Sequence, residues 1–185
     1  MITKEIQKGN ILIAEPAVLT DKSFNRAIIL LTEHNQEGTI GFILNKPSPY
    51  TLNELVFEID NDFRVYIGGP VEQDNLYFIH TLPHLIPDSI EVSDGIFWGG
   101  NYEAVKMYLE QGMIKNNEIR FFLGYSGWSI EQLEQEIKQK TWLMTKNTYP
   151  NIFSINDAKG WKEKLIEMGG TYRLWANAPE DPNLN

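Results

Sequence analysis

Apolar and polar residues alternate along this chain in short runs that predict a protein rich in β-strands. Apolar runs with many β-branched residues occupy positions 10–14, 26–32 and 39–44. The second and third runs flank a polar loop at 33–38 that ends in glycine, a pattern that predicts a β-hairpin. Further short apolar runs predict strands at 65–67, 76–79, 90–92, 96–98, 119–123 and 142–144.

Prolines and periodic apolar residues indicate where strands end and helices begin. Pro47 and Pro49 are expected to stop the third strand, because proline lacks a backbone N–H and holds the preceding residue in extended geometry. Thr51 and Ser129 each begin a capping-box pattern, in which a hydroxyl residue is followed three positions later by Glu or Gln. Helical spacing of apolar residues predicts helices at 51–59, 101–112, 129–137 and 157–168.

The order of these elements predicts an α+β fold. Strands and helices follow one another without regular βαβ alternation, which fits one domain built on a mixed sheet. A chain of 185 residues is long enough for one sizeable hydrophobic core. We expect this domain to span residues 1–170. Residues 171–185 are rich in Asn and Pro and are expected to form a C-terminal extension that is partly frayed.

Composition and charge exclude several classes of function. The chain has no cysteine, so it lacks a disulfide framework, a cysteine zinc site, an iron–sulfur cluster and a cysteine nucleophile. It carries 16 Lys and Arg against 25 Asp and Glu, and this acidic formal charge of −9 argues against general binding to nucleic acid or anionic lipid. The N-terminal residues lack the apolar centre of an export signal, and the run at 27–31 is far shorter than the roughly 20 residues that cross a bilayer. We therefore expect a cytoplasmic protein without a membrane partner.

Two glycine-rich turns are the first candidates for chemistry. Gly68-Gly69-Pro70 is compatible with a tight turn or with a bare backbone surface for a ligand, and neither phosphate-loop motif occurs in the chain. The turn at 124–128 precedes a predicted helix, whose N-terminal N–H groups attract anions. A serine hydrolase is an alternative, with Ser126 paired in space with His34 or His80, although the nucleophile motif lacks its second glycine.

Histidines and lysines supply two further candidates. His80 and His84 have the spacing of a helical metal pair, but Pro83 between them spoils a regular turn, so we expect neither a metal nor another cofactor. Lysines gather between positions 138 and 164, and this cluster is an alternative site for direct DNA binding. No helix-turn-helix, zinc-finger or RNP signature accompanies it, so direct nucleic-acid binding is not the expected function. The lysines are Lys138, Lys140, Lys146, Lys159, Lys162 and Lys164.

Seven short fragments stand out because they combine glycine, proline and polar residues at predicted strand ends. They are Gly9-x-Ile11-Leu12-Ile13-Ala14-x-Pro16, Phe24-x-Arg26, Glu33-His34-Asn35-x-x-Gly38, Gly41-x-x-x-Asn45-Lys46-Pro47, Gly68-Gly69-Pro70-Val71, Val92-Ser93-Asp94-Gly95 and Gly124-Tyr125-Ser126-Gly127-Trp128. In this order and with these gaps, the fragments resemble the AlgH/YqgE family of bacterial proteins, over about positions 8 to 170. The resemblance implies a compact α+β domain whose strongly bent mixed sheet folds toward a pseudo-barrel, with about four flanking helices. Members of this family are labelled transcriptional regulators, so the resemblance also implies a regulatory role.

The resemblance also bears on the alternatives. The family commonly has alanine where this chain has Ser126, which argues against an obligatory serine nucleophile. It commonly has arginine where this chain has Lys46, so the planar fork for bidentate anion binding is missing at that position. An enzymatic activity is therefore not expected.

The fragments fall at strand ends and turns, where a rigid sheet displays binding groups, and we expect them to share one exposed recess. This predicts a non-enzymatic regulatory module that binds a small anionic ligand or a protein partner; the alternative is that these residues merely secure turns. Lys46 and the helix N–H groups after Trp128 would hold a negative group, and His34 would make the contact sensitive to pH. The expected binding residues are Glu33, His34, Asn35, Asn45, Lys46, Pro47, Gly68, Gly69, Pro70, Val71, Tyr125, Ser126, Gly127 and Trp128.

Overall fold

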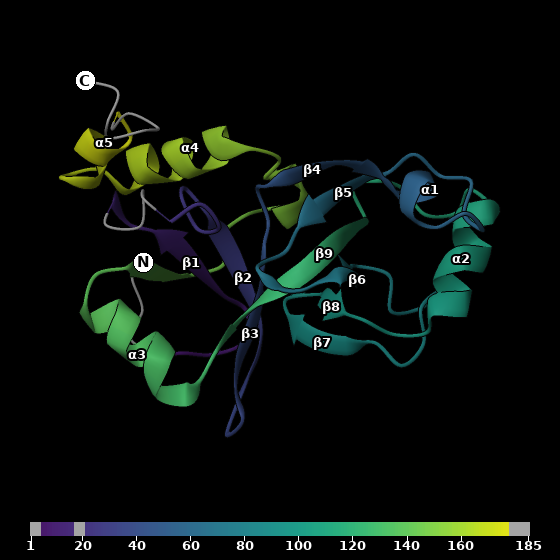
Figure 1. The fold of residues 1–185 in the computed structure, drawn as a ribbon, viewed down its shortest axis with the longest axis horizontal. Coiled ribbons are helices and arrows are strands. Elements are labelled where there is room, and N and C mark those ends of the chain that lie inside the picture. Colours follow the sequence, from purple (N-terminus) through teal and green to yellow (C-terminus); the bar gives the residue numbers. More distant parts are fainter. Residues whose placement is uncertain (1–4, 17–20, 178–185) are drawn as a thin grey trace.

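The computed structural model describes residues 5–16 and 21–177, and its central feature is one strongly curled sheet (Figure 1). The strands are β1 (Asn10–Ala14), β2 (Ile28–Asn35), β3 (Gly38–Ile43), β4 (Pro47–Thr51), β5 (Arg64–Ile67), β6 (Val71–His80), β7 (Ile90–Ser93), β8 (Ile96–Trp98), β9 (Ile119–Trp128) and β10 (Trp142–Lys146). The main path through the sheet has the order β10, β1, β2, β3, β9, β6, β8 and β7. β5 branches off this path, because it pairs with β4 and also with β9.

β9 organises the sheet because it pairs with three other strands. Its first half runs parallel to β5 and antiparallel to β6, and its last residues run antiparallel to β3. The parallel pair of β5 and β9 makes an otherwise antiparallel sheet mixed. The predicted α+β fold with a strongly bent mixed sheet is therefore confirmed.

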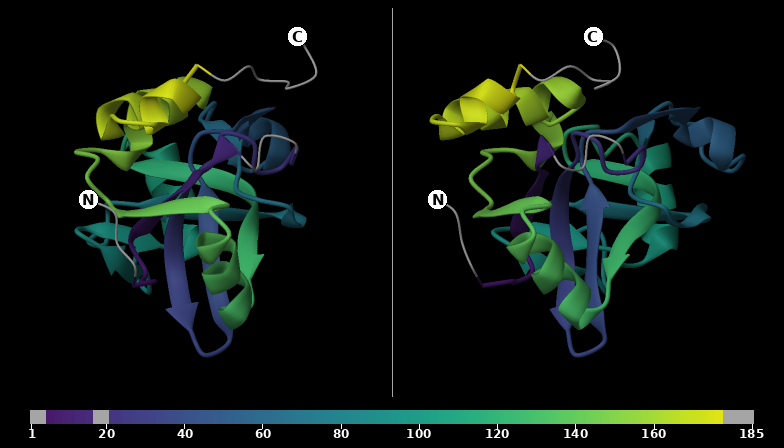
Figure 2. Two further views of the ribbon diagram at one scale, coloured as in Figure 1. Left: turned by 90° about the vertical axis from the view of Figure 1, so that its left-hand side faces the viewer. Right: turned by 60° about the vertical axis from the view of Figure 1, so that its left-hand side comes forward.

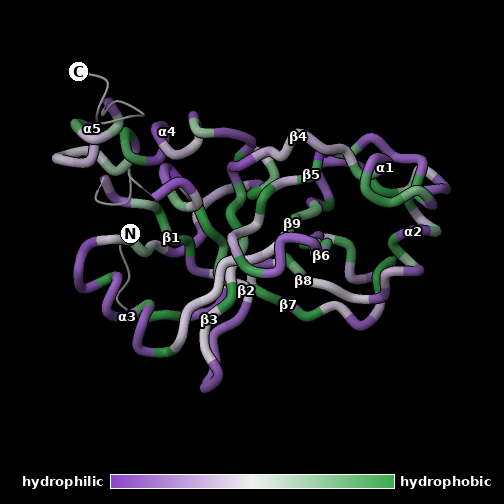
Figure 3. Tube along the Cα trace, in the orientation of Figure 1, coloured by the Kyte–Doolittle hydropathy of each residue, from purple (hydrophilic) through white to green (hydrophobic). Residues whose placement is uncertain are grey.

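The curl brings strands from opposite ends of the sheet order into one core. Ile11 of β1 and Ile28 of β2 belong to the same buried cluster as Val92 of β7 and Ile96 of β8. The curved path of the strands is visible from two further sides in Figure 2. Hydrophobic residues predominate along these inner strands, whereas the tip of the β2–β3 hairpin is hydrophilic (Figure 3). Burial of apolar surface inside the curl is the main force that closes it.

Helices cover the two ends of the molecule. The α-helices of the described residues are α1 (Leu52–Leu55), α2 (Tyr102–Glu110), α3 (Ile130–Lys138), α4 (Ala158–Met168) and α5 (Tyr172–Trp175). α1 and α2 lie at one end of the long axis, whereas α3, α4 and α5 lie toward the other end (Figure 1). The capping boxes predicted at Thr51 and Ser129 are both formed. The fully buried Trp161 ties α4 to β1, because its ring N–H donates to the carbonyl of Ala14 at 2.7 Å.

Several predicted elements differ from the structure. The turn predicted at 124–128 does not form, because these residues continue β9 as far as Trp128. Pro47 and Pro49 do not end the strand region but lie within β4, which pairs only with β5 among the described strands, and an edge strand tolerates proline. The first helix is much shorter than the predicted 51–59. β6 begins at Val71 rather than at position 76, because residues 72–75 are polar and exposed and so hide the strand from a hydrophobic pattern. In the described part of the chain, none of the helices has the length and apolar character needed to cross a bilayer.

Candidate functional site

The predicted glycine-rich turns meet each other in the structure. A Cβ atom on Gly69 would lie 2.2 Å from the carbonyl of Tyr125, and a Cβ atom on Gly68 would lie 2.2 Å from the carbonyl oxygen of Gly124. Ser126 is fully buried beside them, and its hydroxyl donates to the carbonyl of Gly68 at 3.0 Å. Two segments of the main chain therefore touch at this crossing, and their backbone atoms fill the space that a ligand would need.

Asn45 and Lys46 hold the segment before β2 in place. The buried Asn45 accepts from the N–H of Ile28 at 2.8 Å and donates to the carbonyl of Arg26 at 2.8 Å. The Lys46 ammonium donates to the carbonyl of Ser23 at 2.5 Å. Burial lowers the pKa of Lys46, whereas the charge of Asp21 raises it. Both side chains thus satisfy main-chain groups of this protein.

Trp128 is buried at the end of β9 and forms part of a hub around Glu136 of α3. One carboxylate oxygen of Glu136 accepts from the ring N–H of Trp128 at 2.9 Å and from that of Trp142 at 2.7 Å. The other oxygen accepts from Gln132 at 3.0 Å. This hub fixes α3 against β9 and β10. Sequence reasoning missed Glu136, although its position three residues after the inward-facing Leu133 signals a place near the buried helix face.

The predicted binding residues are consequently not gathered in one exposed recess. Asn45, Gly68, Gly69, Ser126 and Trp128 are buried, because strand crossings and main-chain hydrogen bonds use them. Val71 pairs with Tyr125, and Gly127 pairs with Ile40, within the sheet. The exposed or half-buried remainder lies at several places and comprises Glu33, His34 and Asn35 on the hairpin, Lys46 and Pro47 before and in β4, and Pro70, Val71, Tyr125 and Gly127 near the crossing.

The alternatives receive little support from the described contacts. The Ser126 hydroxyl donates to a carbonyl, His34 contacts the Thr39 hydroxyl, and His80 contacts the carbonyl of Gly99. Among the described residues, these hydrogen bonds do not join a histidine to the serine. Lys164 of the lysine cluster is only 6% exposed and pairs with Glu167. Among the described residues, no group of three or more His, Asp or Glu side chains has the arrangement of a metal site.

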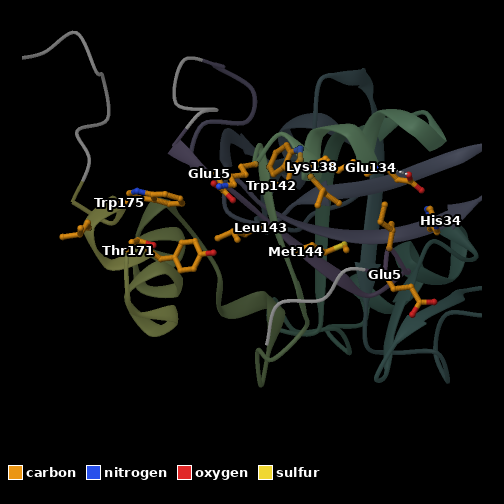
Figure 4. Close-up of a pocket in the computed structure, with 15 residues that line it drawn as sticks. Glu5, Glu15, His34, Glu134, Lys138, Trp142, Leu143, Met144, Thr171 and Trp175 are labelled. Atoms are coloured by element: carbon orange, nitrogen blue, oxygen red, sulfur yellow. Dashed lines mark hydrogen bonds and ion pairs between the residues drawn. The ribbon is translucent and has the colours of Figure 1, made fainter.

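A groove of about 1090 Å³ lies instead beside β10, the edge strand at which the main path begins, and we call it the β10 groove (Figure 4). Trp142, Leu143 and Met144 form its floor. Successive side chains of a strand point to opposite faces of the sheet. A hollow lined by three consecutive residues must therefore reach both faces, so it lies along the edge of the sheet. α3 lines one wall through Glu134, Ile137 and Lys138, and the α5 region lines the other through Thr171, Tyr172, Leu174 and Trp175. The remaining lining residues are Glu5, Ile6, Glu15, His34 and Lys140.

The β10 groove combines apolar walls with charges at its rim. Tyr172 and Trp175 meet edge to face, with ring centroids 5.2 Å apart, and Leu174 beside them is 73% exposed. Burial raises the pKa of Glu15, and the nearby charge of Lys140 lowers it. His34 is the one predicted binding residue that lines this groove. Apolar walls with a few polar groups are typical of a surface that binds a ligand or a partner.

A second hollow, of about 540 Å³, surrounds the buried Arg120 of β9 and is polar. We call it the arginine pocket; Asp62, Arg64, Tyr66, Asn116, Asn117 and Asn156 also line it. The Arg120 guanidinium donates to the carbonyls of Leu44, Ile155 and Phe153 at 2.5–2.7 Å and to Asn156 at 2.9 Å. It also lies 4.1 Å from the centre of the Tyr66 ring. Burial lowers the pKa of Arg120 to about 10.

Comparison with known proteins places this geometry in a family. A model of an AlgH-like family matches residues 11–173. A UPF0301 protein of Bacteroides fragilis is 43% identical over 182 residues, with 96% of this chain and 91% of that protein covered. A UPF0301 protein of Cytophaga hutchinsonii is 38% identical over 182 residues, with 97% of this chain and all (100%) of that protein covered.

Two solved structures share the fold. A crystal structure of a Corynebacterium diphtheriae protein superposes with a TM-score of 0.75 at 20% identity, over 96% of this chain and 95% of that chain. The solution structure of the AlgH protein from Pseudomonas aeruginosa superposes with a TM-score of 0.71 at 23% identity, over 93% of this chain and 94% of that chain. The shared curled sheet and the match over residues 11–173 agree with the resemblance carried by the seven fragments, and the chain belongs to the AlgH-like family.

Proposed function

We propose that this protein is a non-enzymatic regulatory module that binds a ligand or protein partner, and that the β10 groove receives an apolar part of that molecule. The observation that carries the proposal is the apolar wall of the groove. Leu174 is 73% exposed there, beside the half-buried Tyr172 and Trp175, and Ile137 faces them from α3. Covering such surface gains about 25 cal/mol for each Å² of apolar area removed from water.

The regulatory part of the proposal draws on the label of the family that the seven fragments resemble. The sequence has no standard DNA-binding motif, and Lys164 of the lysine cluster is buried in an ion pair. Regulation through a partner therefore fits the chain better than direct contact with DNA. Charged residues of the α3 wall, such as Glu134 and Lys138, would then orient the partner rather than supply most of the affinity.

Leu174→Glu tests the proposal, because it places a charge in the apolar wall at a site that contributes little to folding. Met113→Glu is the matched control, since Met113 is also an exposed apolar residue, at 50%, but lies after α2 near the other end of the molecule. Both variants should unfold within about 0.5 kcal/mol of the parent. The measurement is native mass spectrometry of the proteins and small molecules that copurify from the native host.

The expected result is that Leu174→Glu loses at least about nine-tenths of a specific copurifying molecule, since a 1.4 kcal/mol loss is a tenfold change in affinity. Met113→Glu should retain that molecule. If the parent and both variants yield the same molecules in the same amounts, the β10 groove is not the binding site and the proposal fails.

A further inference from the structure

We propose that the arginine pocket binds a small molecule that carries a phosphate group, that Arg64 donates hydrogen bonds to this group, and that Arg120 attracts it through its buried positive charge. The pocket shares no lining residue with the β10 groove, so this site is separate from the one proposed above. The first observation is the placement of two arginines on paired strands. Val65 pairs with Phe121 in the parallel ladder of β5 and β9, so Arg64 and Arg120 are neighbours on adjacent strands.

The pairing brings both side chains to the same face of the sheet. Adjacent strands lie about 4.8 Å apart, and alternate residues of a strand share a face, so Arg64 and Arg120 project on the side that carries Tyr66. Like charges at facing positions of a sheet repel each other. An anion bound beside the two guanidinium groups would offset this repulsion through its attraction to both charges.

The second observation is that neither arginine forms an ion pair with a carboxylate among the described residues. The ion pairs there join Lys106 with Glu58, Lys138 with Glu134, and Lys164 with Glu167. The four hydrogen bonds that the Arg120 guanidinium donates go to neutral oxygen atoms, although the side chain is only 5% exposed. The buried positive charge is therefore held in place but not neutralised.

The geometry favours a phosphate over a simple monovalent anion. Hydrogen bonds and the Tyr66 ring fix the orientation of Arg120, whereas Arg64 lies exposed and can approach a ligand from the solvent side. The four bonds of Arg120 to the chain occupy the hydrogen atoms on both of its terminal nitrogens, so Arg64 is the arginine that can give phosphate oxygens paired, charge-assisted hydrogen bonds. A dianion also gains more than a monovalent anion from the nearby charge of Arg120. Asp62 also lines the pocket, and its carboxylate opposes the binding of any anion.

The size and lining of the pocket indicate more than an inorganic ion. Its volume of about 540 Å³ falls within the range of small-molecule sites, roughly 300–1,000 Å³. Asn116 and Asn117 line it beside the arginines, and their amides both donate and accept hydrogen bonds. A ligand with hydroxyl groups next to its phosphate fits this lining best.

Inorganic phosphate is the probe that tests the charge site without assuming the rest of the ligand. The protein is labelled with ¹⁵N, and the Nε–H signals of the arginine side chains are followed as phosphate replaces chloride at constant ionic strength. We expect saturable shifts for Arg64 and Arg120 with a midpoint near ~1 mM, a weak affinity, because inorganic phosphate makes only part of the contacts of the full ligand. Acetate, which carries one charge, should bind at least about tenfold more weakly.

Four variants separate a built site from general attraction of anions. Arg64→Gln should raise the phosphate midpoint at least about tenfold, whereas Arg173→Gln, which removes an exposed arginine of α5, should leave it unchanged. Asp62→Asn should lower the midpoint about threefold because it removes an opposing charge, and Asp60→Asn, an exposed carboxylate outside the pocket lining, should not.

Several results would overturn the proposal. Shifts that grow linearly without saturation, or equal effects of Arg64→Gln and Arg173→Gln, would show only nonspecific attraction. Acetate binding as tight as phosphate binding would remove the assignment to a phosphate group. The copurification test of Leu174→Glu examines the β10 groove rather than the arginine pocket. A negative result for one proposal therefore does not contradict the other.

Discussion

The two hollows of this molecule use opposite chemistry. The β10 groove has apolar walls that the chain leaves partly uncovered, with Leu174 73% exposed. The arginine pocket is polar, and its central guanidinium is already fixed by four hydrogen bonds and a tyrosine ring. The difference indicates which parts of each hollow support the fold. A side chain whose donors are saturated by the chain contributes stability, whereas exposed side chains, Leu174 in the groove and Arg64 in the pocket, are available for a partner or ligand.

Arg120→Met should produce the largest loss of stability, and it would sharpen this comparison. The substitution leaves the carbonyls of Leu44, Phe153 and Ile155 without their donor. Breaking a buried charged network costs about 3–5 kcal/mol, and we expect a loss of this size in urea unfolding. Arg120→Lys keeps the charge with fewer donors and should fall between the parent and Arg120→Met. A loss below about 1 kcal/mol, the size of one ordinary hydrogen bond, would contradict a structural role for the guanidinium.

Glu136→Leu should have a smaller effect, because it breaks the hub that holds one wall of the β10 groove. The ring N–H groups of Trp128 and Trp142 would lose their shared acceptor, which costs about 1–3 kcal/mol for each buried donor left unpaired. We expect a total loss of about 2–3 kcal/mol in urea unfolding, followed by tryptophan fluorescence. Glu136→Gln retains an acceptor oxygen and serves as the control, with an expected loss near 1 kcal/mol. Equal stability of the leucine and glutamine variants would show that the hub does not hold α3.

The smallest expected effect on stability concerns His80, which lines neither hollow. Both of its ring nitrogens have hydrogen-bond partners in the chain. His80 is fully buried; one ring nitrogen accepts from the N–H of Leu82 at 3.0 Å, and the other contacts the carbonyl of Gly99 at 3.0 Å. Burial lowers the pKa of His80 below the ordinary value near 6.5, whereas its contact with Gly99 raises it. The unfolded chain therefore binds the proton more readily than the folded chain does. The contribution of neutral His80 to the free energy of unfolding should be fully present above about pH 6.5. It should decrease as the pH falls from 6.5 toward the pKa of the folded state.

The expected slope for one proton is at most about 1.4 kcal/mol per pH unit. His80→Asn should remove this part of the pH dependence of urea unfolding. His84→Asn, which replaces an exposed histidine four positions later, should leave it intact. The interpretation fails if both variants keep the slope of the parent below pH 6.5.

The fold was more predictable than the candidate site. Apolar runs placed most strands because burial imposes the pattern directly, and the hydroxyl-x-x-Glu/Gln spacing placed two helix starts at Thr51 and Ser129. The polar residues 72–75 of β6 and the prolines of β4 escaped prediction, because edge position and exposure relax the usual rules. The fourteen expected binding residues failed to form one recess for a related reason. A glycine where two strands cross and a glycine that faces a ligand look the same in a sequence.

The sequence by itself determined the fold class, the family and the acidic, cysteine-free character of this protein, because local patterns and composition encode them directly. Only the tertiary structure decided that Gly69 meets the backbone of Tyr125, that Arg64 lies beside Arg120, and that α5 faces α3 across β10. The first two of these contacts join residues that are 56 positions apart in the chain, since 125 − 69 and 120 − 64 both equal 56. Strand register and the curl of the sheet set such distances, and both arise from packing of the whole chain rather than from any local pattern.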